Sequence, residues 1–196
     1  MIINLLTENE KKYIKTHSYK ASEILFYEND ICESVGIVLE GEIKIASMTF
    51  KGNEIVYNSL TKGKMFGNNL IFSSDNKYRG DVKATKNSKV ALIDKGSLLT
   101  ILMNNKSFLK EYLTIHSEFA KSLNTKIKLL SFDNAKERLL YYLFINDNHL
   151  IYKSVTSLAQ ELCLSREAAS RLLSRLEKEK IIIKRKHEII LLDDAF

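Results

Sequence analysis

The residues whose types and spacing suit chemistry lie near the C-terminus, between Ser165 and Lys178. On a helix with about 100° per residue, Glu167, Ser170 and Arg171 fall on one side. The opposite side holds only apolar residues, which are Ala169, Leu172, Leu173 and Leu176. One face can therefore pack against a core while the other presents hydrogen-bonding groups, as a helix needs if it lies in the DNA major groove.

The polar face carries donors and acceptors that read base edges. The planar fork of Arg171 matches O6 and N7 of guanine, a contact worth about 1–3 kcal/mol of discrimination. Glu167 can accept a hydrogen bond from the N4 amine of cytosine, and an acid on a DNA-facing surface makes little sense unless it reads a base. Ser170 is small enough for close approach. We assign base reading to Arg166, Glu167, Ser170 and Arg171.

Phosphate contacts are expected around this helix, because Lys and Arg bind phosphate without reading sequence. Ser165 suits the N-cap, where the helix terminus favours an anion. Residues 163–187 hold eight Lys and Arg against three Asp and Glu, whereas residues 1–60 hold six against nine. This distribution indicates double-stranded DNA as the partner of the C-terminal part. The residues assigned to phosphate binding are Ser165, Arg175, Lys184 and Lys186. For either lysine, the alternative is an exposed side chain that serves only solubility.

Further elements are needed to position the reading helix. A short helix and a tight turn precede it from Val155, and Ile181–Leu192 has the pattern of a β-hairpin. Asp133 is expected to cap an earlier helix with the sequence AKERLLYYLFI. Together these stretches predict a winged helix–turn–helix over residues 132–196.

The N-terminal half has a different pattern, with all seven glycines at or before Gly96. After a short helix expected over residues 4–16, strand-like stretches run from Tyr19 to Asp94. Turn-forming residues separate them at roughly 8–12-residue spacing, which is typical of a sandwich or jelly roll. We therefore expect an α+β chain whose first domain, residues 1–106, is a β jelly roll.

A long amphipathic helix is predicted over Ser107–Leu130, within a segment that we set at residues 107–131. Its apolar residues recur every three or four positions, close to a coiled-coil seam. The helix is either a spine packed on its own domain or a dimer interface, and the stripe is longer than one small domain needs. The interface residues predicted for a homodimer are Leu109, Tyr112, His116, Phe119, Leu123, Ile127 and Leu130.

At the level of motifs, the chain resembles the cyclic-AMP receptor/FNR (Crp/Fnr) family of bacterial transcription regulators. The stretch Leu164–Arg171 is similar to the family's recognition-helix signature, an Arg-Glu pair followed four positions later by Arg. Glu40–Ile43 is similar to its glycine turn between early strands, and Gly63–Gly67 to the start of its phosphate-binding cassette. The resemblance implies a cyclic-nucleotide-binding-like β-roll, a homodimer on a TGTGA-like inverted repeat, and RNA polymerase as a partner if the protein is an activator.

The resemblance also locates an effector pocket, from which this sequence departs. Cyclic-AMP-binding members carry a Glu that holds the ribose and an Arg, followed by Ser or Thr and Ala, that neutralises the phosphate. Here Asn68 stands in the position of that Glu. Arg79 can take the position of the phosphate-binding Arg only if the loop after the cassette is one residue longer than in those members. We therefore expect an unidentified effector other than cyclic AMP, or none. The pocket residues, if one exists, are Phe66, Gly67, Asn68, Asn69, Arg79, Leu123 and Asn124.

Other classes of protein are disfavoured. Cys32 and Cys163 are far apart, so we expect no metal, no iron–sulfur cluster and no other cofactor; a redox role for Cys32 is an open alternative. No signal peptide, membrane span or catalytic constellation is visible, which predicts a cytoplasmic protein that is not an enzyme. The remaining alternative is a ligand-sensing module whose winged domain contacts protein rather than DNA.

Overall fold

The computed structural model describes residues 1–192 of the chain. The last four residues of the predicted 132–196 domain therefore lie outside the described residues. The chain folds as two compact units, Met1–His116 and Ser117–Phe196, called unit 1 and unit 2 below. Across residues 1–192, no helix is both long enough and apolar enough to cross a membrane.

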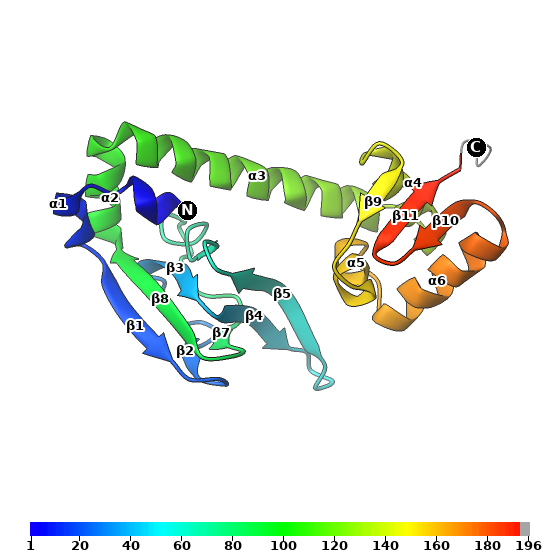
Figure 1. Ribbon diagram of the computed structural model, residues 1–196. Helices are drawn as coiled ribbons and strands as arrows, with labels where there is room; N and C mark the ends of the chain where they lie inside the picture. Colours follow the sequence, from blue (N-terminus) through cyan, green and yellow to red (C-terminus); the bar gives the residue numbers. More distant parts are fainter. Residues whose placement is uncertain (193–196) are drawn as a thin grey trace. The chain divides into compact units, whose positions relative to one another are not determined.

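Unit 1 contains two antiparallel four-stranded sheets (Figure 1). The first has the strand order β1 (Lys15–Tyr19), β8 (Ser88–Asp94), β3 (Ser34–Glu40) and β6 (Met65–Phe66). The second has the order β2 (Ile24–Phe26), β7 (Asp81–Ala84), β4 (Glu42–Met48) and β5 (Glu54–Thr61). This arrangement confirms the predicted jelly roll.

Strand β7 contributes alternate side chains to the core of unit 1, with Val82 and Ala84 buried and Asp81 and Lys83 half-buried, because successive side chains of a strand point to opposite faces. Close packing requires a glycine at position 36. A Cβ on Gly36 would lie 2.0 Å from the Phe66 ring, so no larger residue fits opposite this ring. Gly41 has a φ of +86° in the turn between β3 and β4, where its freedom is needed.

The start of the chain differs from the expectation of one helix over residues 4–16. The structure has a short 3-10 helix, Ile2–Leu5, then α1 (Glu8–Lys11) with a Thr7–Glu10 capping box. Lys15 already begins β1, which pairs with β8. Backbone pairing with an existing strand overrides the weak helical pattern of these residues.

Two helices follow the sheets. The first is α2 (Lys95–Asn104), N-capped by the Asp94 carboxylate, which accepts a hydrogen bond from Ser97 N–H at 2.9 Å. The second is α3 (Lys106–Leu130), which runs from unit 1 into unit 2. Phe108 and Tyr112, near its start, are buried in the core of unit 1.

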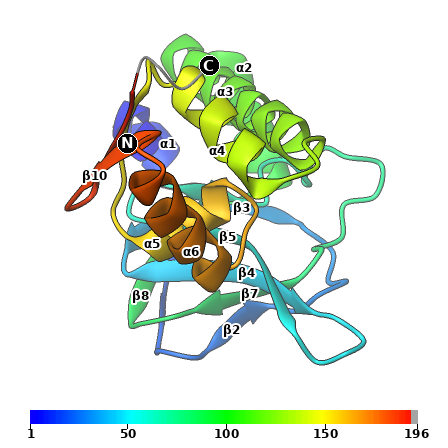
Figure 2. The ribbon, with the colours of Figure 1, turned by 90° about the vertical axis from the view of Figure 1, so that its right-hand side faces the viewer.

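Unit 2 has the expected winged helix–turn–helix architecture, with α5 (Val155–Glu161) and α6 (Arg166–Lys178) side by side (Figure 2). Asn134, rather than the expected Asp133, caps the first helix, because its side-chain oxygen accepts a hydrogen bond from Glu137 N–H. The sequence also missed the short strand β9. The elements are α4 (Ala135–Phe144), β9 (His149–Ile151), α5 (Val155–Glu161), α6 (Arg166–Lys178), β10 (Ile182–Arg185) and β11 (Glu188–Leu191).

Candidate nucleic-acid interface

Helix α6 is fixed by its N-terminus and its apolar face. The Ser165 hydroxyl accepts a hydrogen bond from Ala168 N–H at 3.1 Å, which satisfies one of the free donors of the first turn. The residues of the apolar face are all buried in unit 2, and they are Ala169, Leu172, Leu173 and Leu176. The opposite face of the helix is therefore held in one orientation toward solvent.

The four side chains assigned to base reading, Arg166, Glu167, Ser170 and Arg171, are all exposed. Within the described part of the chain, neither arginine forms an ion pair. Their guanidinium groups thus keep all of their donors for another molecule. Ser165 is exposed as well, but its hydroxyl already accepts the capping hydrogen bond.

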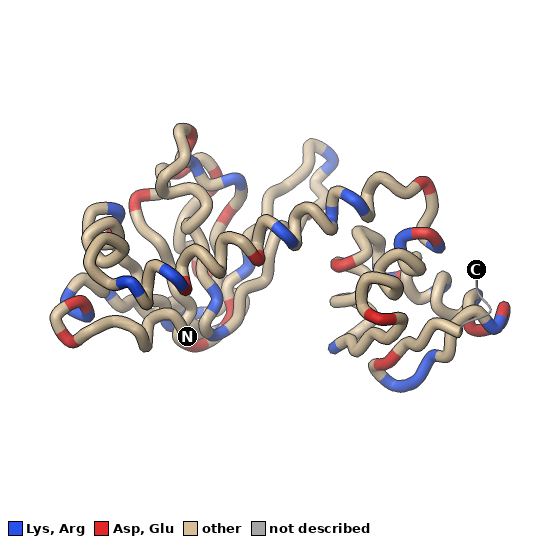
Figure 3. Tube along the Cα trace, turned by 90° about the horizontal axis from the view of Figure 1, so that it is seen from above, with Lys and Arg blue, Asp and Glu red and all other residues tan. Residues whose placement is uncertain are grey.

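The β10–β11 hairpin carries a run of basic residues at its turn (Figure 3). Lys186 is exposed and Lys184 is half-buried. Glu188 holds the base of this turn, because its carboxylate lies 2.8 Å from His149 Nε2 and 3.5 Å from Arg185 Nη1. The hairpin can therefore present lysines while its backbone stays anchored.

Arg175, the remaining residue assigned to phosphate, lies one turn beyond Arg171 on α6. Its Nε is 3.8 Å from the Glu179 carboxylate, and both side chains are largely exposed. An exposed pair at this distance contributes little, on the order of 0–1 kcal/mol. Arg175 is consequently available for a phosphate at small cost.

The residues assigned to an effector pocket have different surroundings in the structure. Phe66 is buried in the core. Asn68 is buried, but its Nδ2 lies 3.4 Å from His116 Nε2, so the amide bonds to α3. Arg79 is exposed and paired with Asp75 at 2.8 Å. Leu123 and Asn124 are exposed residues of unit 2.

A different residue, Tyr78, points into the roll beside this cassette. It is 1% exposed, and its ring stacks on that of Phe26 with 4.9 Å between centroids. The site therefore lacks the carboxylate and the inward guanidinium that would hold a ribose and a cyclic phosphate. The residues present do not fit cyclic AMP, and Asn69, in the same loop, supplies no charge in their place.

The burial of Cys32 bears on the redox role that the sequence left open for this residue. The thiol is fully buried, and its single hydrogen can be donated to the carbonyl oxygen of Ser34 or of Gly67, which lie 3.4 and 3.5 Å from the sulfur. Desolvation raises the pKa of the thiol. A buried thiol with a raised pKa is a poor nucleophile, so the structure argues against a redox role.

The stripe assigned to a dimer interface divides at the unit boundary. Tyr112 is buried in the core of unit 1, and its hydroxyl donates to the Asn68 carbonyl at 3.2 Å, so this side chain packs within its own unit. Leu109 is half-buried, as is His116, whose ring lies 4.6 Å from that of Tyr112. The remaining four residues lie in unit 2 and are exposed: Phe119, Leu123, Ile127 and Leu130.

Two family models match the chain. The model described as a cyclic nucleotide-binding domain matches residues 16–105. The model described as a Crp-like helix-turn-helix domain matches residues 137–195. A relative that aligns with most of the chain is the anaerobic regulatory protein of Bacillus subtilis (strain 168), which is 25% identical over 184 residues, covering 88% of this chain and 75% of that protein.

Solved structures show the same fold. A variant of CooA from Carboxydothermus hydrogenoformans superposes with a TM-score of 0.71 at 20% identity, covering 100% of this chain and 91% of that one. The catabolite activator protein of Thermus thermophilus gives a TM-score of 0.59 at 18% identity, covering 99% and 94%.

A β-roll of the cyclic nucleotide-binding type, joined to a winged helix–turn–helix with a polar reading face, defines a DNA-binding transcription regulator. The chain belongs to the Crp/Fnr family of these regulators, as the Leu164–Arg171 stretch predicted. The family consists of regulatory DNA-binding proteins and not of enzymes.

Proposed function

We propose that this chain acts as a homodimer that reads an inverted-repeat, TGTGA-like operator with α6. The observation that carries the proposal is the division of α6 into a buried apolar face and an exposed face bearing Arg166, Glu167, Ser170 and Arg171. A second copy would place a second reading helix one turn of DNA away, about 34 Å, which requires an inverted repeat.

The exposed stripe of α3 supports the dimer. Four apolar side chains, Phe119, Leu123, Ile127 and Leu130, are between 36% and 66% exposed along one side of this helix. Four large apolar groups at helical spacing are costly to leave in water and suit the seam of a two-helix interface. The proposed functional division is a sensor domain at 1–106, a dimerisation helix at 107–131 and a DNA-binding domain at 132–196.

The proposed regulator does not respond to cyclic AMP. Asn68 bonds to His116, and Tyr78 fills the roll interior, so the polar groups that a cyclic nucleotide needs are missing. Any effector is a different small molecule. The protein acts where bacterial DNA lies, in the cytoplasm, and contacts RNA polymerase if it activates transcription.

The test begins with selection of binding sites from random duplexes by the purified full chain. Arg171→Ala is expected to remove about 1–3 kcal/mol of discrimination per half-site, because it deletes the bidentate guanine contact. Lys186→Ala is its matched control. It should weaken binding to all duplexes alike and lower the salt slope by about 1.

Two results would contradict the proposal. If Arg171→Ala kept the selectivity of the wild type, α6 would not be the reading element. If the wild type selected no duplex over random competitor, the winged domain would instead contact another protein.

A further inference from the structure

The Arg138 guanidinium, on α4, joins two segments of unit 2 that are far apart in the sequence. Its Nη1 donates to the carbonyl oxygen of Cys163 and its Nη2 to that of Phe132, each at 3.3 Å. The Nε atom is buried and has no partner among the described residues. One side chain thus ties the α3–α4 linker to the turn between α5 and α6.

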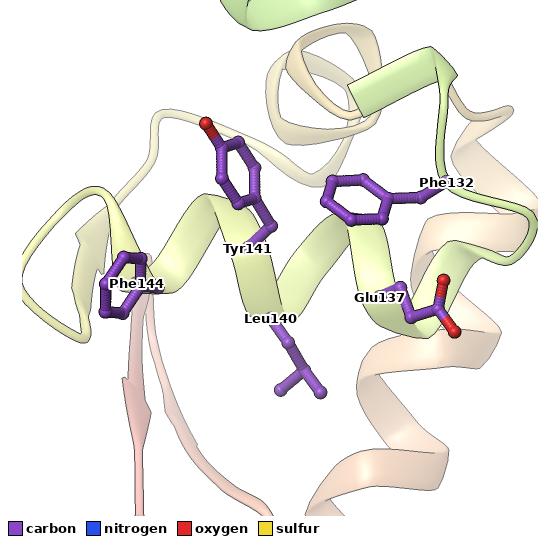
Figure 4. A pocket seen from close by; sticks show the side chains of 5 residues that line it. All are labelled: Phe132, Glu137, Leu140, Tyr141 and Phe144. Atoms are coloured by element: carbon purple, nitrogen blue, oxygen red, sulfur yellow. The ribbon is translucent and has the colours of Figure 1, made fainter. Parts of the chain in front are cut away.

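The first segment, the linker at residues 131–134, is held at two points. The Phe132 ring lies 5.2 Å from the Tyr141 ring, centroid to centroid, beside an apolar pocket on the outer face of α4 (Figure 4). The Phe132 carbonyl accepts the hydrogen bond from Arg138. The ring and the carbonyl therefore fix the direction in which the chain leaves α3.

The second segment is the turn that starts the reading helix. Cys163 has a φ of +55°, a left-handed conformation that is unfavourable for a residue with a side chain. Its carbonyl belongs to the peptide that leads to Leu164 and to the N-cap of α6, Ser165. A hydrogen-bond donor on this carbonyl orients the peptide group that lies two residues before the N-cap of α6.

We propose that Arg138 is a positioning residue that sets the orientation of α6 relative to the end of α3, and thereby the half-site spacing that the dimer accepts. The inference rests on the proposed function, because spacing has meaning only for a dimer on an inverted repeat. Arginine suits this role, since its planar fork reaches two carbonyls at once. A lysine keeps the charge but presents a single ammonium group, which cannot hold both segments in the same geometry.

The test compares the full-length wild type, Arg138→Lys, and the control Lys136→Arg, which makes the reverse exchange on the same helix. Each protein is titrated with a half-site duplex, with the selected inverted repeat, and with repeats whose spacer is one base pair longer or shorter. Arg138→Lys should bind the half-site like the wild type, while its preference for the selected spacer falls about tenfold. Lys136→Arg should keep that preference.

A merely structural role predicts another pattern, in which half-site and full-site binding of Arg138→Lys weaken together and spacer preference survives. That pattern would overturn the inference. If Arg138→Lys does not fold, Arg138→Gln decides, because its shorter side chain has a single nitrogen in place of the two that reach the Cys163 and Phe132 carbonyls. It should relax spacer preference in the same way, and retained preference would refute the proposal.

The wild type alone tests the proposed function. If it binds the inverted repeat no better than two separate half-sites, the dimeric reader is refuted, and this inference with it. If it prefers one spacer and both variants keep that preference, only the role of Arg138 fails.

Discussion

Replacing Tyr78 by phenylalanine should stabilise unit 1, although it removes a polar group from a buried residue. The hydroxyl of Tyr78 has no hydrogen-bond partner of adequate geometry among the described residues, and the Cys32 thiol beside it is a weak partner. Desolvation raises the pKa of this hydroxyl far above its usual range, so it stays neutral. The stacked contact of the ring with Phe26 does not involve the oxygen and survives the substitution.

The expected magnitude follows from the desolvation cost of the hydroxyl. A buried donor left unsatisfied costs about 1–3 kcal/mol, and the thiol recovers part of this cost. Tyr78→Phe should therefore raise the free energy of unfolding of unit 1 by about 1 kcal/mol. Tyr27→Phe is the matched control, because Tyr27 is 60% exposed and the same substitution there should leave stability unchanged within about 0.5 kcal/mol.

Native-state hydrogen exchange is the appropriate assay, because a chain of two units need not unfold in one transition. The amides of β3 and β8, which are paired in the first sheet, report on the opening of unit 1. A gain of 1 kcal/mol corresponds to about fivefold slower exchange. Faster exchange in Tyr78→Phe would refute the reasoning, and would mean that a water molecule or a ligand binds the hydroxyl.

Two further predictions concern α3. Burial lowers the pKa of His116, so the folded state binds a proton on this ring less tightly than the unfolded state does. The free energy of unfolding, measured by urea titration, should therefore fall as the pH drops below about 6.5, and His116→Gln should make this fall less steep. Parallel plots of unfolding free energy against pH for the wild type and the variant would contradict this prediction. Ile127→Asp should shift the protein to monomers in sedimentation velocity without loss of helical content, because Ile127 is 66% exposed; a dimer that persists would exclude the stripe as the interface.

Local patterns were sufficient for much of the fold. The glycine turn at Gly41 and the alternating strands predicted the roll, and the period of the 165–178 stretch predicted α6 with the correct buried face. These features depend on neighbours in the sequence. The strand β1 was missed because its stability comes from pairing with β8, more than sixty residues away.

The stripe on α3 shows a limit of periodicity. Tyr112 and Ile127 follow one continuous apolar pattern, yet Tyr112 is covered by its own unit and Ile127 is exposed. Periodicity reports that a face will be buried, but not which surface covers it. Arg138 was missed for a related reason, since nothing in the sequence near it indicates carbonyl partners 6 and 25 residues away.

The phosphate-binding cassette separates the requirements of the fold from those of a ligand. Gly67 has a φ of +74°, and a Cβ there would lie 2.8 Å from the Ser34 carbonyl oxygen, so the backbone requires glycine whether or not anything binds. Asn68, the next residue, is free of that requirement, and its amide bonds to His116 on α3. Glycine at this position thus serves the turn of the cassette, independently of what the domain binds. A motif built on glycines identifies the domain, whereas the polar residues between them decide what the domain binds.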